Sequence, residues 1–386
     1  MEIITGDEHD LRQLINGAYQ RIDRSSTNIE RYALADYLAQ LHEAERAMTG
    51  KKSELDYERC FGSKSKYRKY SKYLDSLFGR LDSEFIKFKG YHQSHFDTML
   101  AINDDALEEL VDDVYCEEYS TISRGEFLQY FFEFLSEYGL EAQFDKFISG
   151  RKIFNRPFNE GEKYAGTVLH DPLKHRSSIF LCDFEYTIPY LLTLGHEFGH
   201  TFDLNKFNKK DVDAYMRYSY SSIYGETMAM VFEKLFYDFL FRKKYRINDV
   251  KENYSEFVFE DKNYVLDGYI LSLLPEDVII RLSCDGVSSR DVVQLVKDSF
   301  TRLDELERHL DERKLDTWKT PLYAYGDYFS TILKNDIQEE GFDCRLMREF
   351  FDLRTKEFNP GLLNDVGFDM DTYQKVYTRD VSRLKK

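Results

Sequence analysis

Apolar residues recur every three or four positions through most of the first 140 residues. Clear examples of the repeat are Leu11, Leu14, Ile15, Ala18, Tyr32, Ala35, Leu38 and Leu41. This spacing places apolar side chains on one face of a helix, so it predicts successive amphipathic helices over residues 8–140. The run Phe127–Leu135 is apolar almost throughout, which predicts a buried helix.

A different pattern follows between residues 150 and 186. Gly150, Pro157 and Gly161 interrupt the chain, as turn residues do. Two short stretches, Tyr164–His170 and Ser177–Phe184, then have the length and composition of strands. Because no other part of the sequence has a convincing strand pattern, we predict one small β-sheet.

Helical periodicity resumes at Ile188 and continues toward the C-terminus. Further helices are predicted at about residues 222–241, 291–310 and 323–333. The predicted fold is mainly α, with the small sheet packed beside the helix that begins at Ile188. A change in composition near residue 140 suggests an N-terminal helical region, 1–140, and a second region, 141–386.

The composition is that of a folded, acidic protein. Of the 386 residues, 42% are hydrophobic and 16% are aromatic, which suffices for a sizeable core. The formal net charge of -17 disfavours nucleic acid and anionic membranes as partners. One basic stretch with interleaved tyrosines, Lys64–Lys72, superficially resembles a nucleic-acid patch. In so acidic a chain it is better explained as a solvated helix face.

Several sequence features favour a cytoplasmic protein. The N-terminal residues lack the basic and apolar segments of a signal peptide, and no apolar run reaches the roughly 18 residues of a membrane span. The five cysteines are scattered and form no Cys-x-x-Cys pair, so we expect free thiols in a reducing compartment. The sequence does not indicate an oligomeric state.

The clearest chemical motif lies in the helix that begins at Ile188. His196 and His200 are four residues apart and therefore lie on one face of that helix, about one turn from each other. Two imidazoles in this arrangement can bind one metal ion, and Glu197 between them can reach a metal-bound water. A surface His-Glu-His face is the simpler alternative, but the apolar helix and the strand just upstream favour a zinc site.

A catalytic zinc ion takes three protein ligands and keeps one position open. Glu226 is a candidate third ligand, because it is a carboxylate at the start of an otherwise apolar helix. Glu233 lies on the same face two turns later, where it could accept the second N–H of a ligating histidine. Another carboxylate could instead be the third ligand. With one Zn²⁺ ion the expected chemistry is metal-assisted hydrolysis, in which Glu197 is the general base.

These residues resemble a known family. The segment Glu160–Gly166, the strand at 177–184 and the stretch Thr193–His200 are similar to the oligoendopeptidase F branch of the thimet-oligopeptidase-like metallopeptidases. In that family the third ligand is a Glu opening the next helix, with another Glu seven residues later, a pattern that Glu226 and Glu233 match. The resemblance implies a multi-helical, zincin-like metallopeptidase fold and an N-terminally short member of the family.

Two later segments also resemble the family. Pro321–Tyr325 is similar to a segment that supplies tyrosines to the substrate and the oxyanion, and Leu362–Met370 is similar to the family's C-terminal motif. The resemblance implies catalytic roles for Tyr325 and Tyr328 and substrate contacts for Tyr323 and Gly326. The sequence departs from the family by having Asp316-Thr317-Trp318 where a His is usual and Asp327 in place of a third Tyr.

Other readings of these residues stay open. A chain with 29 Tyr can hold such a cluster in its core. The strand Ser178–Phe184, which includes Phe180, could receive a peptide at the sheet edge or could simply pack on the motif helix. His92 and His95 are expected to form a surface pair without metal.

The sequence thus predicts a cytoplasmic zinc endopeptidase that hydrolyses oligopeptides. A relative of the family that binds peptides or a protein without cleaving them is one alternative. A protease dedicated to one protein substrate is another.

Overall fold

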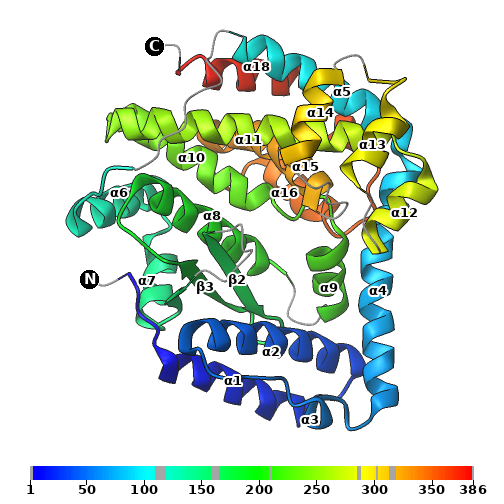
Figure 1. Ribbon diagram of the computed structural model, residues 1–386. Helices are drawn as coiled ribbons and strands as arrows, with labels where there is room; N and C mark the ends of the chain where they lie inside the picture. Colours follow the sequence, from blue (N-terminus) through cyan, green and yellow to red (C-terminus); the bar gives the residue numbers. More distant parts are fainter. Residues whose placement is uncertain are drawn as a thin grey trace. The chain divides into compact units, whose positions relative to one another are not determined.

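The computed structural model describes residues 3–108, 119–157, 165–207, 211–284, 288–300, 303–312 and 319–384. These residues form a mainly α-helical protein with one small β-sheet, as the sequence predicts (Figure 1). The elements of the first half are α1 (Glu8–Ile22), α2 (Asn28–Thr49), α3 (Tyr57–Phe61), α4 (Lys64–Lys87), α5 (Lys89–Leu107), α6 (Arg124–Glu137), α7 (Glu141–Ser149), β1 (Ile153–Arg156), β2 (Gly166–Asp171), β3 (Arg176–Cys182) and α8 (Ile188–Leu204).

In the second half of the described chain, every regular element is a helix. Its elements are α9 (Val212–Ser221), α10 (Thr227–Lys243), α11 (Ile247–Leu273), α12 (Glu276–Cys284), α13 (Ser289–Val296), α14 (Leu303–Glu312), α15 (Lys319–Glu340), α16 (Arg345–Leu353), α17 (Pro360–Val366) and α18 (Met370–Val381). The helix predicted over 291–310 is two helices, α13 and α14. Among the described residues, no helix is both long and apolar enough to cross a membrane.

The chain folds into two compact units that interleave along the sequence. The first unit comprises Met1–Asp75, Cys116–Arg217 and Met228–Asn253. The second comprises Ser76–Tyr115, Tyr218–Thr227 and Tyr254–Lys386. Each unit therefore contains segments from both sides of residue 140, where composition alone suggested a boundary.

Helix starts in the first unit are fixed by local side-chain chemistry. Thr27 caps α2 by accepting a hydrogen bond from the Glu30 backbone N–H, and the Glu30 carboxylate accepts one from the Thr27 backbone N–H. Ser123 and Glu126 form the same capping box at α6. Such reciprocal caps satisfy backbone N–H groups that have no partner inside the helix, so they define where each helix begins.

The sheet of the first unit has the strand order β1-β3-β2. Strand β1 runs parallel to β3, with Phe154 opposite Phe180, and β2 runs antiparallel to β3, with Thr167 opposite Phe180. The prediction that Ser178–Phe184 is an edge strand is therefore wrong, because β3 is paired on both sides. Strand β1 was not predicted, since four residues between turns are too short to show a strand pattern.

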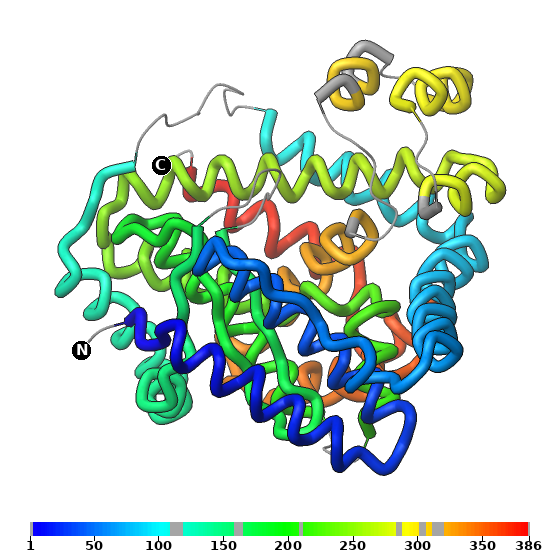
Figure 2. Tube along the Cα trace, turned by 60° about the horizontal axis from the view of Figure 1, so that its bottom comes forward, coloured from blue at the N-terminus to red at the C-terminus, as the bar shows by residue number. Residues whose placement is uncertain are grey.

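Helices cover both faces of this sheet. Phe154, Leu169 and Phe180 share one apolar cluster with residues of α1 and α2, which run side by side below the sheet (Figures 1 and 2). Side chains alternate along a strand, so Ile179 and Leu181 point to the other face, where α8 packs. The Phe180 ring stacks on Phe154 at 4.7 Å, on the side of the sheet away from α8. Phe180 therefore points away from the motif helix, and its contact with a substrate stays a prediction.

The second unit has an aromatic core that contains two histidines. His92 and His95 on α5 are 0% and 7% exposed, so the expectation of a surface pair is wrong. The His92 ring stacks on Phe85 at 4.4 Å, and the His95 ring stacks on Tyr325 at 5.3 Å. An i, i+3 spacing fits a buried helix face as well as an exposed one, so the spacing could not decide between them. The two stacked rings come from other helices, α4 and α15.

These histidines should make stability fall in mild acid. Burial lowers the pKa of both His92 and His95 to about 3, from an ordinary value of 6.5. The unfolded chain binds protons below that ordinary value while the folded chain does not. The contribution of the two neutral histidines to the free energy of unfolding is therefore complete above pH 6.5 and is lost as the pH falls toward 3. Between pH 7 and 5 each histidine should remove about 2 kcal/mol from the free energy of unfolding.

Urea unfolding at several pH values measures this effect. His95→Phe keeps an aromatic ring in place but removes one titrating group. The free energy of unfolding should therefore fall by about 2 kcal/mol less between pH 7 and 5 than in the native chain. His9→Gln, at an exposed position on α1, is the control and should leave the slope as it is. An unchanged slope in His95→Phe would contradict the assignment.

Candidate active site

Helix α8 carries the His-Glu-x-x-His motif in its second half. Thr187 is its N-cap residue and Pro189 lies in its first turn, where a missing N–H costs no helical hydrogen bond. The His196 and His200 rings are 5.0 Å apart between centroids and are inclined at 80°. The two imidazoles are thus neighbours on one face of the helix, as their spacing requires.

Helix α10 places a carboxylate against the first of these rings. Glu233 Oε2 lies 2.9 Å from His196 Nδ1, and both side chains are largely shielded from solvent. A carboxylate at this position favours the tautomer with its proton on Nδ1, which leaves Nε2 to act as a metal ligand.

Glu226 completes a group of three possible metal ligands. One nitrogen from His196, one from His200 and one carboxylate oxygen from Glu226 lie within 4.8 Å of one another. Glu226 is the last residue of a turn, and α10 begins one residue later at Thr227, so the helix starts later than the predicted residue 222. Two imidazoles and one carboxylate are the ligand set of many catalytic zinc sites.

Two glycines let α8 approach α10 closely. A Cβ at Gly199 would lie 2.6 Å from the Met228 carbonyl oxygen and 2.8 Å from the Ala229 Cα. A Cβ at Gly195 would meet the Phe236 ring at 3.0 Å. The Gly199 contact fixes the first turn of α10 against the motif helix. Because Glu226 precedes Met228 by two residues, the same contact helps to set the position of Glu226.

Gly199→Ala should therefore destabilise the protein although alanine favours helices. Overpacking against backbone costs about 1–3 kcal/mol, and the gain in helix propensity offsets about 1 kcal/mol of it. Gly79→Ala is a matched control, because a Cβ at Gly79 in α4 meets nothing within 4 Å. That control should raise the free energy of unfolding in urea. If Gly199→Ala raised it equally, the close approach of α8 and α10 would be refuted.

The start of β2 lies against Glu197. A Cβ at Gly166 would lie 2.8 Å from both Cγ and Oε1 of Glu197, and 3.0 Å from Cγ2 of Thr193. Glu197 itself is 5% exposed. Sequence reasoning placed Gly166 in a strand but did not predict this contact, although a glycine in a strand often marks a close approach.

The tyrosines predicted to act in catalysis lie on α15 of the second unit. Tyr325 and Tyr328 are 0% and 1% exposed, and Tyr325 Oη lies 2.5 Å from His92 Nδ1. Burial raises the pKa of both phenols, so both stay protonated at neutral pH. Tyr323 stacks on Tyr264 with centroids 4.4 Å apart, and Gly326 is buried in the same helix. Their roles in catalysis stay predictions.

The segments at 160–164 and 316–318 that entered the family comparison lie outside the described residues. The three cysteines described as free, Cys60, Cys182 and Cys344, are all buried.

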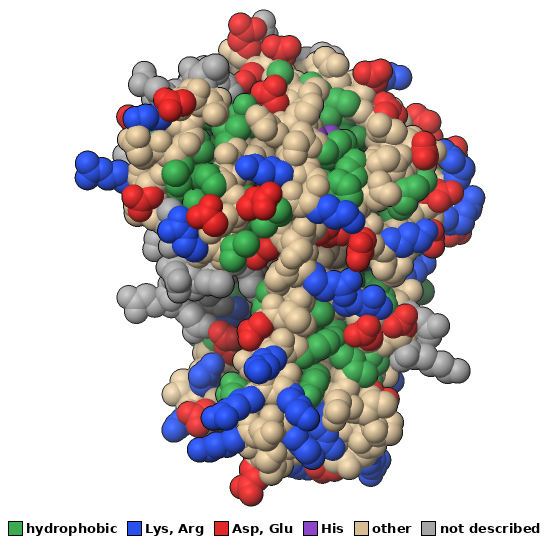
Figure 3. All heavy atoms as spheres, turned by 90° about the vertical axis from the view of Figure 1, so that its right-hand side faces the viewer, with side chains coloured by type: hydrophobic (Ala, Val, Ile, Leu, Met, Phe, Trp, Pro, Cys, Tyr) green, Lys and Arg blue, Asp and Glu red, His purple; other side chains and the backbone are tan. Residues whose placement is uncertain are grey.

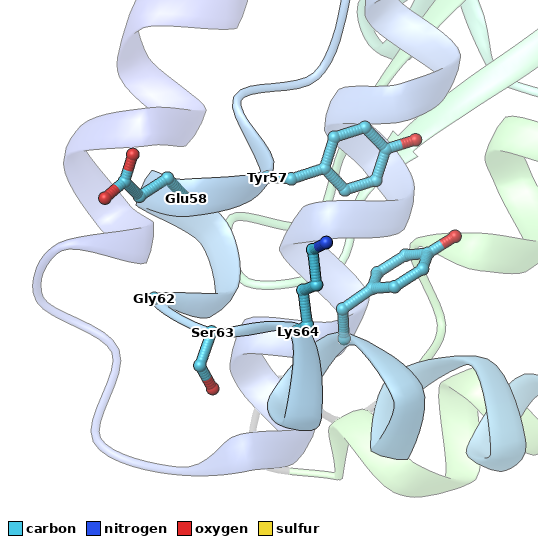
Figure 4. Close-up of a pocket in the computed structure, with 6 residues that line it drawn as sticks. Tyr57, Glu58, Gly62, Ser63 and Lys64 are labelled. Carbon is cyan, nitrogen blue, oxygen red and sulfur yellow. The ribbon is translucent and has the colours of Figure 1, made fainter.

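The basic stretch at 64–72 forms the exposed first turns of α4. Lys and Arg side chains gather over α3 and this end of α4 on the face that Figure 3 shows. Beside them is a hollow of about 490 Å³ whose lining includes Tyr57, Lys64 and Tyr67, and Figure 4 shows the Lys64 side chain near the Tyr57 ring. No residue of the His-Glu-x-x-His motif lines this hollow. The Lys and Arg side chains at 64–72 are exposed, as expected for the solvated helix face that the charge pattern predicts.

No family model matches the chain, and no curated protein matches it. A solved structure of a candidate peptidase from Chlamydophila abortus is similar, with 12% sequence identity and a TM-score of 0.45. The similarity covers 99% of this chain and 74% of that chain. A likeness of this degree carries no inference about function.

Proposed function

We propose that the chain is a zinc-dependent endopeptidase that hydrolyses peptide bonds of oligopeptides. The observation that supports this most is the group formed by His196, His200 and Glu226, with Glu197 on the same helix between the two histidines. Two imidazoles and one carboxylate that converge on one point form a ligand set found in catalytic zinc sites.

The donor set fits zinc. His196 and His200 supply two nitrogens and Glu226 supplies one oxygen, which leaves a position open in a four-coordinate site. Zinc, when bound, supplies a Lewis acid that lowers the pKa of water and polarises a carbonyl group. Glu233 holds the His196 ring in orientation through Nδ1.

Glu197 is the proposed general base. Its carboxylate takes a proton from the attacking water and later delivers that proton to the leaving amine nitrogen. It is nearly enclosed, with Gly166 on one side, so its carboxylate is held in place and bulk water has little access to it. A glutamine at this position would have almost the same shape but could not accept the proton.

Strand β2 is the proposed guide for a peptide. It pairs with β3 on one side, and no described strand pairs with its other side. An extended peptide can add to a free strand edge through main-chain hydrogen bonds. Because β2 begins at Gly166, which contacts Glu197, a peptide on this edge would pass close to the proposed base.

A digest of defined substrates tests the proposal. The zinc-loaded chain is incubated with a diverse oligopeptide mixture and with unfolded and folded proteins, and the products are identified by mass spectrometry. We expect internal cleavage of peptides that a chelator abolishes and added zinc restores. Zinc-loaded protein that cleaves none of these substrates would favour a peptide-binding function, and cleavage of proteins alone would favour a dedicated protease.

A further inference from the structure

A second hollow lies in the first unit, behind the motif helix. It has a volume of about 700 Å³ and is formed by α7, the chain leading into β1, the turn between β2 and β3, and the last turns of α8. Figure 1 shows α7 beside the sheet on this side of the unit. The charged side chains that line it are Lys146, Lys152, Arg176 and Lys206, with His175 beside them.

The hollow is separate from the proposed metal site. Helix α8 contributes Phe198 and Thr201 to its wall, and its C-cap residue contributes Asn205. At about 100° per residue, these positions lie on the side of the helix opposite His196 and His200. A ligand in the hollow would therefore contact the rear of the motif helix.

Three of the four cations in the hollow, Lys146, Lys152 and Arg176, form no ion pair within the described part of the chain. The carboxylate that acts on Lys152 is Asp171, at longer range, and Asp171 is itself paired with Arg21. Burial, and then the charge of Arg176, lower the pKa of Lys152. Positive charge is thus concentrated here in a protein whose net charge is -17.

Helix ends account for part of this arrangement. Lys146 lies in the last turn of α7, and Lys206 follows the end of α8, where cations interact favourably with the helix dipole. Lys152 and Arg176 do not lie at helix ends. Lys152 immediately precedes β1, and Arg176 is the first residue of β3. Two aromatic contacts help to position the ammonium groups of Lys152 and Lys206. The Lys152 Nζ lies 5.1 Å from the centre of the Phe147 ring, and the Lys206 Nζ lies 4.8 Å from that of Phe202.

We propose that this hollow binds a small molecule that carries two or more phosphate groups. Each phosphate group carries about -1.5 to -2 charges, so at least two are needed to balance the three cations that form no ion pair. An Arg offers bidentate hydrogen bonds to phosphate, and Lys binds it as a point charge. Ser177, Asn205 and Gln143 add neutral hydrogen-bonding groups to the wall, and the volume is that of an ordinary small-molecule site.

Calorimetric titration with inorganic tripolyphosphate tests this proposal directly. We expect saturable binding of one molecule per chain at moderate ionic strength, with much weaker binding of citrate, a trivalent anion without phosphate. Lys146→Gln and Lys152→Gln should each weaken binding about tenfold, because each removes one charge-assisted contact. Lys146 is exposed, so its replacement should leave folding intact even if Lys152→Gln does not.

Matched controls are Lys66→Gln and Lys69→Gln, which remove exposed cations from α4. Chelation of the zinc ion by tripolyphosphate would occur equally in all variants and so cannot produce a difference between them. Absence of saturable binding would overturn the proposal. The proposal would also be overturned if the α4 variants lost as much affinity for tripolyphosphate as the variants of the hollow, or if Lys146→Gln lost none. In either case the binding would not be specific to the hollow. The test uses no activity measurement, so it is independent of the proposed peptidase function.

Discussion

Glu197→Gln is expected to lower kcat/KM for peptide hydrolysis by about 10²- to 10⁴-fold, the usual contribution of a general base. The substitution keeps the volume of the side chain, which matters because Gly166 lies against Glu197. Zinc bound per chain should not change, since Glu197 does not belong to the proposed ligand group. Kinetics with a peptide from the digest, together with metal analysis of the same sample, measures both quantities.

Glu185→Gln is the matched control for this experiment. Glu185 is exposed and lies just before α8, so its replacement changes the charge near the motif helix without touching the site. The control should retain full activity. Zinc-loaded Glu197→Gln that cleaves as fast as the control would remove Glu197 as the base and leave the metal assignment standing.

Zinc affinity should fall in a graded series across the residues around His196. Glu226→Ala and His200→Ala each remove a proposed ligand, whereas Glu233→Gln removes only the hydrogen-bond partner of His196. Loss of such a partner typically costs about 10- to 100-fold in metal affinity, so the two ligand variants should lose more than that. The physical reason is that a lost ligand removes a bond to the ion, while a lost partner only loosens the ring.

Competition with a chromophoric chelator gives these affinities, and unfolding curves of the metal-free variants show whether each is folded. Glu185→Ala should bind zinc as the native chain does. If Glu226→Ala kept native affinity, the third ligand would be another carboxylate. If Glu233→Gln lost more affinity than Glu226→Ala, the two glutamates would have to exchange roles.

Much of the fold follows from short-range patterns. The periodicity at residues 11–18 and the apolar run at 127–135 lie in α1 and α6, because one amphipathic face needs only neighbours three or four positions away. Strand β1 has no such pattern, since four residues are ordered mainly by pairing with β3. The central position of β3 also depends on β1, so local sequence could not reveal it.

The sequence by itself determined that His196 and His200 share a helix face with Glu197 between them, because helical geometry is local. Tertiary structure decided what meets that face: the approach of α10 at Gly199, which brings Glu226 and Glu233 to the imidazoles, and the glycine of β2 beside Glu197. It also decided that His92 is enclosed by aromatic rings, and that cations from separate elements converge behind α8. Such groupings join residues far apart in the chain, and packing, which no local pattern encodes, brings them together.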